Sequence, residues 1–161
     1  MNITYSGMLR EPSVIEETFS KMPSPDVVSK LEAIILDGPQ VDLETCHLIH
    51  EGVCSRTVFI KAGTVVTGAK TNIPNICVVS GDITATTDEG LKRFTGYHVL
   101  KANAGFKRAV LAHSDTYWTT IWKSELTDIC ELEDEMTDES SMLQTRRDGI
   151  FYEAQQALEG Q

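Results

Sequence analysis

Histidine is the residue type in this chain best suited to bind a metal ion, and its four copies are His47, His50, His98 and His113. His47 and His50 are three residues apart on a predicted strand, so they point to opposite faces and cannot hold one ion together. His98 and His113 lie on later predicted strands that can approach each other across a sheet. Two interpretations stay open for this pair: a two-histidine metal site, or two histidines hydrogen-bonded within the sheet.

A row of aromatic residues follows His113. Trp118 and Trp122 share one face of a predicted strand, and Tyr117 lies on the opposite face. Large aromatics in one row are typical of a hydrophobic core. The alternative is a barrel mouth lined by aromatics, with Arg108 and His113 as polar contacts for a small anionic or aromatic ligand. The predicted ligand-binding residues are Arg108, His98, His113, Tyr117, Trp118 and Trp122.

The other reactive side chains indicate no particular chemistry. The four cysteines, Cys46, Cys54, Cys77 and Cys130, form no Cys-x-x-Cys pair, and we expect free buried thiols. A Cys46–Cys54 disulfide in a hairpin is the alternative, and it requires an oxidising compartment. No Ser-His-Asp order, phosphate-binding glycine loop or pair of carboxylates at a strand end stands out. We therefore predict no catalytic residue, no metal ligand and no cofactor.

Length and composition predict one ordinary globular domain. The chain has 161 residues, of which 41% are hydrophobic and 24% charged. Its net charge of −10 would repel nucleic acids and anionic membrane surfaces, so we expect neither as a partner. No apolar run approaches the roughly 20 residues that span a bilayer, and the first residues lack the pattern of a signal peptide. We therefore expect a protein of a reducing cytoplasm that is not secreted by a signal peptide.

Helical periodicity dominates residues 1–44, which we interpret as an N-terminal helical extension. Residues 11–22 place their apolar side chains roughly on one face. A stronger helix is predicted from Pro25, which suits a first turn, to just before Gly38, which can end it. Its apolar stripe must cover either the barrel of the same chain or a neighbouring subunit, and we favour a dimer or a higher symmetric ring.

The periodicity becomes strand-like between residues 45 and 124. Eight short segments rich in β-branched and aromatic residues are bounded by turn residues, and residues 87–90 form a predicted hairpin turn. Strands without an intervening helix indicate a closed or nearly closed antiparallel barrel, or a sandwich. Small residues such as Ala85, Ala102 and Ala112 would allow a hollow interior.

Helical patterning returns in residues 125–161. Thr127 is a candidate N-cap for a helix with three apolar residues on one face, which we expect to pack on the barrel. Its carboxylates are expected to face water or a basic partner, so changing Glu133 to glutamine should cost little. Arg146 and Arg147 are expected to pair with this acidic run or to contact a neighbouring subunit. The apolar face consists of Ile129, Leu132 and Met136.

The region from about His47 to Glu135 resembles the cupin superfamily, and among its members it looks most like the cupin-like proteins of tailed bacteriophages. The resemblance covers a little over half of the chain and implies a cupin-like jelly-roll barrel over residues 45–124. The barrel would lie between the N-terminal helical extension and an acidic C-terminal helix. The segments that carry the resemblance are PQVD (39–42), RTVFIKAGTVVTG (56–68), GFKRAVLAHSDTYWTTIW (105–122) and MTDESSMLQTRRD (136–148).

Cupins carry two short motifs whose histidines and glutamate bind metal, and other residues occupy those positions in this chain. The first motif fits between Gly63 and Gly81, and the second begins at Gly96. Alanine and threonine are not strong ligands, and an arginine would repel a cation. The resemblance therefore implies a barrel without its usual metal site. The ligand positions fall on Ala69, Thr71, Pro74 or Asn75, and Arg108, and the asparagine that ends the second motif falls on Ala112.

The resemblance leaves three functions open. We favour a non-catalytic structural or assembly protein of a bacteriophage, located in the host cytoplasm or the virion. It would act through homo-oligomer contacts and contacts with other virion or phage proteins. The second function is a cupin module that binds a small molecule without metal. The third is a metal-independent cupin enzyme of the isomerase type, with His98 or His113 and Tyr97 or Tyr117 as its reactive pair.

Overall fold

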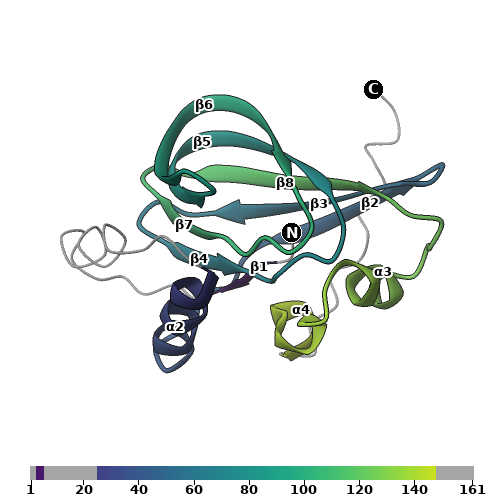
Figure 1. Cartoon of the computed structure of the whole chain (residues 1–161), viewed down its shortest axis with the longest axis horizontal. Coiled ribbons are helices and arrows are strands. Elements are labelled where there is room, and N and C mark those ends of the chain that lie inside the picture. Colours follow the sequence, from purple (N-terminus) through teal and green to yellow (C-terminus); the bar gives the residue numbers. More distant parts are fainter. Residues whose placement is uncertain (1–2, 6–24, 148–161) are drawn as a thin grey trace.

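The computed structural model describes residues 3–5 and 25–147 (Figure 1). Within these ranges the chain is mainly β, with antiparallel strands that curl into a half-barrel and a few short helices, which confirms the predicted fold class. No helix in these ranges combines the length and apolar character needed to cross a membrane. The strands are β1 (Ile3–Tyr5), β2 (Thr45–His50), β3 (Val53–Ile60), β4 (Val65–Gly68), β5 (Asn75–Thr87), β6 (Gly90–Ala102), β7 (Ala109–Ala112) and β8 (Thr116–Lys123). The helices are α2 (Pro25–Leu36), α3 (Ile129–Met136), the 3-10 turn η1 (Ser140–Met142) and α4 (Gln144–Arg147).

Strand β5 joins the two layers of the barrel. One edge of β5 pairs with β6 along its whole length. The other edge pairs with β8 through Ile76–Ser80 and then with β7 through Ile83–Ala85. One layer therefore continues through β8, β3 and β2, and the other through β7, β4 and β1. Figure 1 shows the two layers facing each other, with β6 arching over β5.

Gly81 lies where β5 passes from one layer to the other. A Cβ atom at this position would lie 2.0 Å from Thr116 Oγ1 and 2.8 Å from Thr116 Cα, so only glycine fits without a shift. Gly81 pairs with Gly96 of β6, whose φ of +88° also favours glycine. The sequence predicted four short strands here, whereas the structure has two continuous strands of 13 residues each. The predicted hairpin turn between Thr87 and Gly90 is confirmed.

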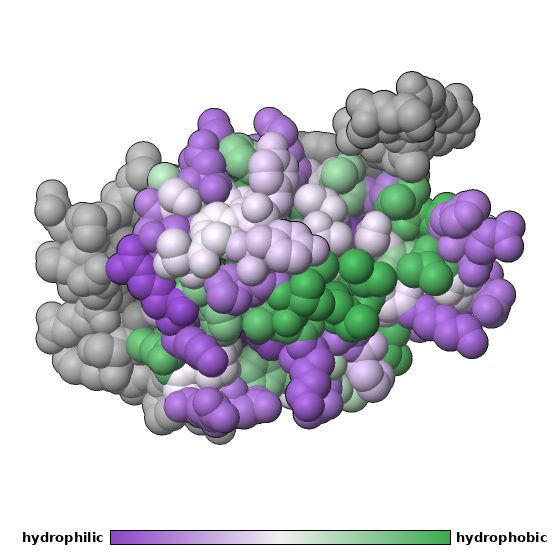
Figure 2. All heavy atoms as spheres, turned by 90° about the horizontal axis from the view of Figure 1, so that it is seen from above, coloured by the Kyte–Doolittle hydropathy of each residue, from purple (hydrophilic) through white to green (hydrophobic). Residues whose placement is uncertain are grey.

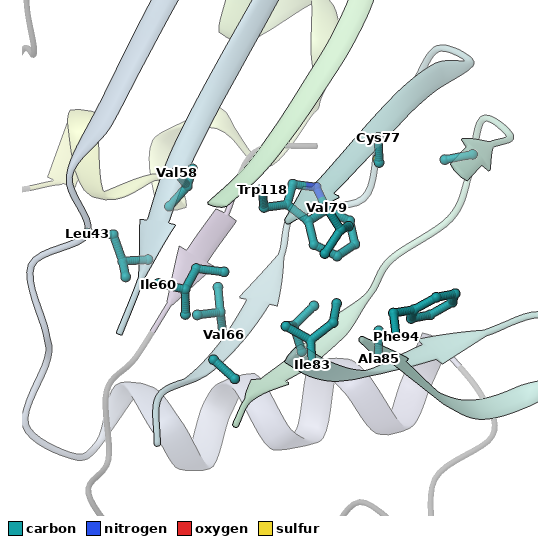
Figure 3. Close-up of a cluster of buried hydrophobic side chains, with 13 residues drawn as sticks. Leu43, Val58, Ile60, Val66, Cys77, Val79, Ile83, Ala85, Phe94 and Trp118 are labelled. Carbon is teal, nitrogen blue, oxygen red and sulfur yellow. The ribbon is translucent and has the colours of Figure 1, made fainter. Parts of the chain in front are cut away.

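The main core fills the space between the two layers. Figure 3 shows side chains from both layers pointing toward one another, with Trp118 fully buried among them. The core includes Ala85, Ala102 and Ala112, three of the small residues that the sequence offered for a hollow interior. All four cysteines are free thiols, so the Cys46–Cys54 disulfide is not formed.

Helix α2 covers the outer surface of the β4–β7 layer. Val28, Leu31 and Ile35 pack against three apolar residues of β4 and β7, and Figure 1 shows the helix beneath these strands. The predicted helix bounds are confirmed, and its apolar stripe covers the barrel of the same chain. The helical interpretation of residues 1–44 is wrong for Ile3–Tyr5, which form β1 and pair with β4. The predicted helix over residues 11–22 lies outside the described residues.

Helix α3 closes one end of the barrel, as its apolar face predicts. Leu132 and Met136 are fully buried in a second cluster with Cys54 and Trp122. The N-cap is Asp128, whose side chain accepts a hydrogen bond from the Glu131 backbone, so the predicted cap at Thr127 is wrong by one residue. Aspartate is the stronger capping residue of the two.

The prediction that the carboxylates of α3 face water or a basic partner is wrong for Glu133, which is only 2% exposed and is held by arginines of its own chain. Its Oε1 accepts hydrogen bonds from Arg56 Nη1 and Thr145 Oγ1, each at 2.8 Å, and its Oε2 accepts one from Arg146 Nε at 2.8 Å. Arg56 lies on the inner face of β3, and a buried cation requires a carboxylate. The predicted pairing of Arg146 with the acidic run is confirmed, and the side chain of Arg147 lies outside the described part of the chain.

Candidate functional site

Arg108 and Lys107 precede β7 and point in opposite directions, as consecutive residues of an extended segment do. Lys107 points away from the barrel interior. Its Nζ lies 3.0 Å from Oε1 of Glu32 on α2 and 2.9 Å from Oε2 of Glu139, which follows α3. Arg108 faces the inside of the barrel and reaches the Trp118 ring of the main core. Two neighbouring cations thus have different environments: one is held by two carboxylates, and the other enters the barrel.

The Arg108 guanidinium is buried against aromatic rings. The side chain is 5% exposed, and its Cζ lies 4.8 Å from the centroid of the Phe106 ring and 5.5 Å from that of Trp118. Its Nε has no hydrogen-bond acceptor among the described residues. Burial lowers the pKa of Arg108, while Cys77 and Asp88 act in the opposite direction. Aromatic rings stabilise the charge, but they do not supply the acceptor that a buried N–H needs.

A cavity of about 360 Å³ opens beside Arg108. It lies between the tip of the β5–β6 hairpin, the strand β6 and the loop that leads to β7. Its volume is within the range of small-molecule sites, roughly 300–1,000 Å³. The apolar part of its lining includes Phe94, Leu100, Ala102 and Phe106, and the charged part consists of Asp88, Glu89, Lys92, Lys101 and Arg108.

Of the predicted aromatic residues, only Trp118 lies beside Arg108. Trp122 shares the same face of β8 but packs in the second cluster, against Leu132 and Met136. Tyr117 lies on the outer face of the sheet, where it is 56% exposed and its ring centroid is 5.0 Å from that of Phe59. The predicted assignment of faces is confirmed, and it separates Tyr117 from the barrel interior.

The histidines make separate local contacts. His98 Nε2 lies 3.0 Å from the Thr95 carbonyl oxygen, and its ring meets the Phe94 ring edge-on. His113 Nε2 lies 2.7 Å from Thr84 Oγ1. Within the described residues, no group of three or more His, Cys, Asp or Glu is arranged to hold a metal ion. Both histidines are hydrogen-bonded as that interpretation expects, although His113 lies one residue beyond the end of β7.

The positions that match cupin metal ligands are buried, and one of them carries a positive charge. Ala69 and Thr71 are 0% and 2% exposed, and the Thr71 Oγ1 has no hydrogen-bond partner in the described part of the chain. Asn75 accepts a hydrogen bond from Cys77 Sγ at 3.3 Å. Arg108 therefore places a positive charge at the position that the resemblance aligns with a metal-binding histidine, where it would repel a metal ion.

The sequence did not indicate Phe94, Leu100, Phe106 or Lys101 as lining residues. Phe94 and Leu100 lie on the inner face of β6, which takes every second residue of the strand. Leu100 also packs against the main core. The alternation of buried and exposed residues along β6 could have indicated Phe94 and Leu100. It was not recognised because Gly96 makes the strand look like two short segments. Phe106 follows a glycine in a loop, where periodicity gives no information.

The chain matches no protein-family profile and no curated protein. It is similar to several solved cupin structures, each at low identity. One similar structure is a cupin superfamily protein from Desulfitobacterium hafniense DCB-2, with 14% identity and a TM-score of 0.45 over 65% of this chain and 93% of that one.

Two further structures are similar at the same level. Ectoine synthase from P. lautus has 19% identity and a TM-score of 0.47 over 59% of this chain and 75% of its own. The Cupin_2 domain of an XRE family transcriptional regulator from Enterobacter cloacae has 11% identity and a TM-score of 0.42 over 49% of this chain and 94% of its own. Similarities this distant say nothing about what the chain binds, and the bacteriophage part of the resemblance gains no support from them.

Proposed function

We propose that this chain is a metal-free, cupin-like binding module that holds a small organic anion in the cavity beside Arg108. The observation that carries the proposal is the buried Arg108 side chain, which lines the cavity and whose Nε lacks an acceptor among the described residues. A buried N–H without an acceptor destabilises a fold, and such conflicts between a residue and its surroundings gather at functional sites. An anion in the cavity would supply the missing acceptor.

The lining favours binding over catalysis. Among the described residues that line the cavity there is no histidine, cysteine or tyrosine. Its two carboxylates, Asp88 and Glu89, lie exposed at the hairpin tip. The tyrosines and histidines of the isomerase hypothesis therefore lie outside this cavity. We therefore prefer the binding module to the assembly role that the sequence favoured.

The test is to replace Arg108 by methionine, which has an unbranched apolar side chain. Isothermal titration with a panel of small aromatic and aliphatic acids should show binding to the wild type and none to Arg108→Met. The variant should be at least as stable in urea, because it no longer buries a charge. The matched control is Arg93→Met, since Arg93 is 60% exposed, pairs with Asp82 and lies outside the cavity. Equal binding by Arg108→Met, or no binding by the wild type, would contradict the proposal.

A second candidate, an assembly role through contacts between copies, is favoured by the outer face of the β6–β5–β8 layer. Tyr97, Val99, Ile76 and Tyr117 are 70%, 59%, 48% and 56% exposed. The register brings Tyr97 and Tyr117 to either side of Ser80, so these residues share one face. Figure 2, which views the molecule from above, shows a hydrophobic patch on this side.

We propose a second copy of the chain as the occupant of this face. The chain carries a net charge of −10, so two copies repel each other wherever carboxylates meet. The four residues of the patch carry no charge, Ser80 and Thr119 between them are uncharged, and the residue opposite Ile76 is the cation Lys101, so no carboxylate lies among them. A symmetric contact through this face keeps the carboxylates of the two copies apart. Such a pair would be the building unit of the assembly that the bacteriophage resemblance implies.

A further inference from the structure

The identity of the anion rests on the proposed binding function and on the geometry around Arg108. Its Cζ lies over the Phe106 ring at 4.8 Å and over the Trp118 ring at 5.5 Å. Both rings are close enough for cation–π contact with the guanidinium, whose five N–H groups form a planar fork. A ligand group that offers two acceptor oxygens side by side matches this fork. A carboxylate has this geometry.

The charged residues that line the cavity favour a ligand with a single negative charge. The lining has three cations, Lys92, Lys101 and Arg108, and two carboxylates, Asp88 and Glu89, which leaves one net positive charge. A monoanion balances this charge. A second negative group on the ligand would exceed the positive charge of the lining, and the two carboxylates of the hairpin tip would repel it.

The walls favour an apolar, flat body. Phe94 is 5% exposed and Leu100 packs against the main core, so both present fixed apolar surfaces. Phe106 adds a third, aromatic wall. The cavity of about 360 Å³ corresponds to about a dozen water-sized atoms at the volume of liquid water. A single or fused aromatic ring with one acidic group fits this space.

We infer that the cavity selects an aromatic monocarboxylate, with its carboxylate on Arg108 and its ring against Phe94, Leu100 and Phe106. Inorganic phosphate and dicarboxylates match the same arginine, but the rim carboxylates disfavour their second charge. An uncharged aromatic amide matches the walls, but it lacks the charge that Arg108 requires. Selectivity among these compounds is therefore the property that distinguishes this inference from anion binding in general.

The experiment compares 2-naphthoate, naphthalene-2,6-dicarboxylate, 2-naphthamide and inorganic phosphate as probes, by titration calorimetry and by quenching of tryptophan fluorescence. The wild type should bind 2-naphthoate most tightly. Arg108→Gln should weaken 2-naphthoate about tenfold to a hundredfold, the value of one hydrogen bond to a charged group. The double variant Asp88→Asn, Glu89→Gln should bind the dicarboxylate more tightly than the wild type does. Ala102→Leu, which narrows the cavity and leaves Arg108 in place, should weaken 2-naphthoate as well.

The outcomes separate this inference from the proposed function. Tighter binding of phosphate or the dicarboxylate than of 2-naphthoate by the wild type, with loss on Arg108→Gln, would overturn the monocarboxylate and leave anion binding intact. Equal affinity for 2-naphthoate and 2-naphthamide would also overturn it. No binding of any probe to the folded wild type would overturn both. Circular dichroism of each variant confirms the fold, and the effect of Ala102→Leu supplies the answer should Arg108→Gln not fold.

Discussion

Two buried arginines of this chain show different ways to hold a charge away from water. Arg56 is 1% exposed and faces the Glu133 carboxylate at 2.8 Å, so its charge is balanced within the fold. Arg108 is 5% exposed and faces two aromatic rings and a cavity. The first arrangement serves stability and the second suits a ligand, although both residues are arginines on inner faces of the barrel.

Replacing Glu133 by glutamine should lower the free energy of unfolding by about 3–5 kcal/mol, the cost of breaking a buried ion pair from one side. The buried Arg56 and the partly buried Arg146 would both lose the carboxylate that they face. The matched control is Glu131→Gln on the same helix, where the residue is exposed and the change should cost only tenths of a kcal/mol. Urea unfolding near neutral pH measures both, and equal effects would show that the buried cluster does not stabilise the fold.

His47 should make the protein sensitive to mild acid. Burial, and to a smaller extent Arg56, lower the pKa of His47 to about 3, from an ordinary value of about 6.5. Below pH of about 6.5 the unfolded chain binds a proton that the folded chain excludes, so stability falls as the pH drops from about 6.5 toward 3. The nearby charges are Arg56 and Glu133. The Oε1 atom of Glu133 lies 3.8 Å from His47 Nε2 and already forms an ion pair with Arg56.

The comparison of wild type with His47→Asn measures this effect. The difference in free energy of unfolding between them should change by about 1 kcal/mol for each pH unit below about 6.5. His50→Asn is the control, because His50 is exposed on the same strand. A difference that stays constant between about pH 7 and about pH 5 would show that His47 binds a proton as readily in the folded protein as in the unfolded chain.

At the scale of elements, local patterns in the sequence predicted those parts that local rules govern. The helix α2, the hairpin turn at Thr87–Gly90 and the two faces of β8 agree with prediction because periodicity and turn residues act over a few positions. The burial of Glu133 was missed because its partner Arg56 is 77 positions away in the sequence. No local pattern reports such a contact.

The candidate site was predictable to a similar extent. Arg108 was indicated because it falls on the histidine position of the second cupin motif, and Trp118 because it belongs to the row of aromatic residues after His113. Phe94 and Leu100 were not, because the bend of β5 and β6 at Gly81 and Gly96 makes two long strands look like four short ones. The three-dimensional course of β6, and not its composition, brings these residues to the cavity.

The bend itself gives a test at the element scale. Gly81→Ala should lower the free energy of unfolding by about 3 kcal/mol, because the added Cβ overlaps both Thr116 Oγ1 and the Thr116 backbone. Gly96→Ala should cost about 1–2 kcal/mol, since it meets only the strain of a positive φ and no atom within 4 Å. Urea unfolding of both variants decides the point, and an equal or smaller loss for Gly81→Ala would show that the contact with Thr116 is not restrictive.

At the scale of the whole molecule, charge and apolar surface are separated. The acidic helix α3 and its flanking segments lie at one end, and the outer face of the β6–β5–β8 layer carries exposed apolar side chains (Figures 1 and 2). The sequence predicted that the apolar stripe of α2 contacts a neighbouring subunit or its own barrel. Val28, Leu31 and Ile35 of this stripe pack on the barrel of the same chain, and Ile34 stays 57% exposed. The outer sheet face is therefore the surface on which the oligomer prediction now depends.

Light scattering should give a mass of twice 17.8 kDa at micromolar concentration if two copies meet through this face. Ile76→Glu with Tyr117→Glu should reduce the mass to that of one chain, because both positions are exposed at the centre of the face and the added charges would meet their counterparts in the second copy. The matched control is Ile34→Glu, since Ile34 is 57% exposed on α2, outside this sheet face, and should leave the dimer intact. Ile34→Glu should still bind 2-naphthoate, because Ile34 does not line the cavity. A wild type that scatters as a single chain, or a dimer that survives the paired change and dissociates on Ile34→Glu, would contradict the contact proposed here.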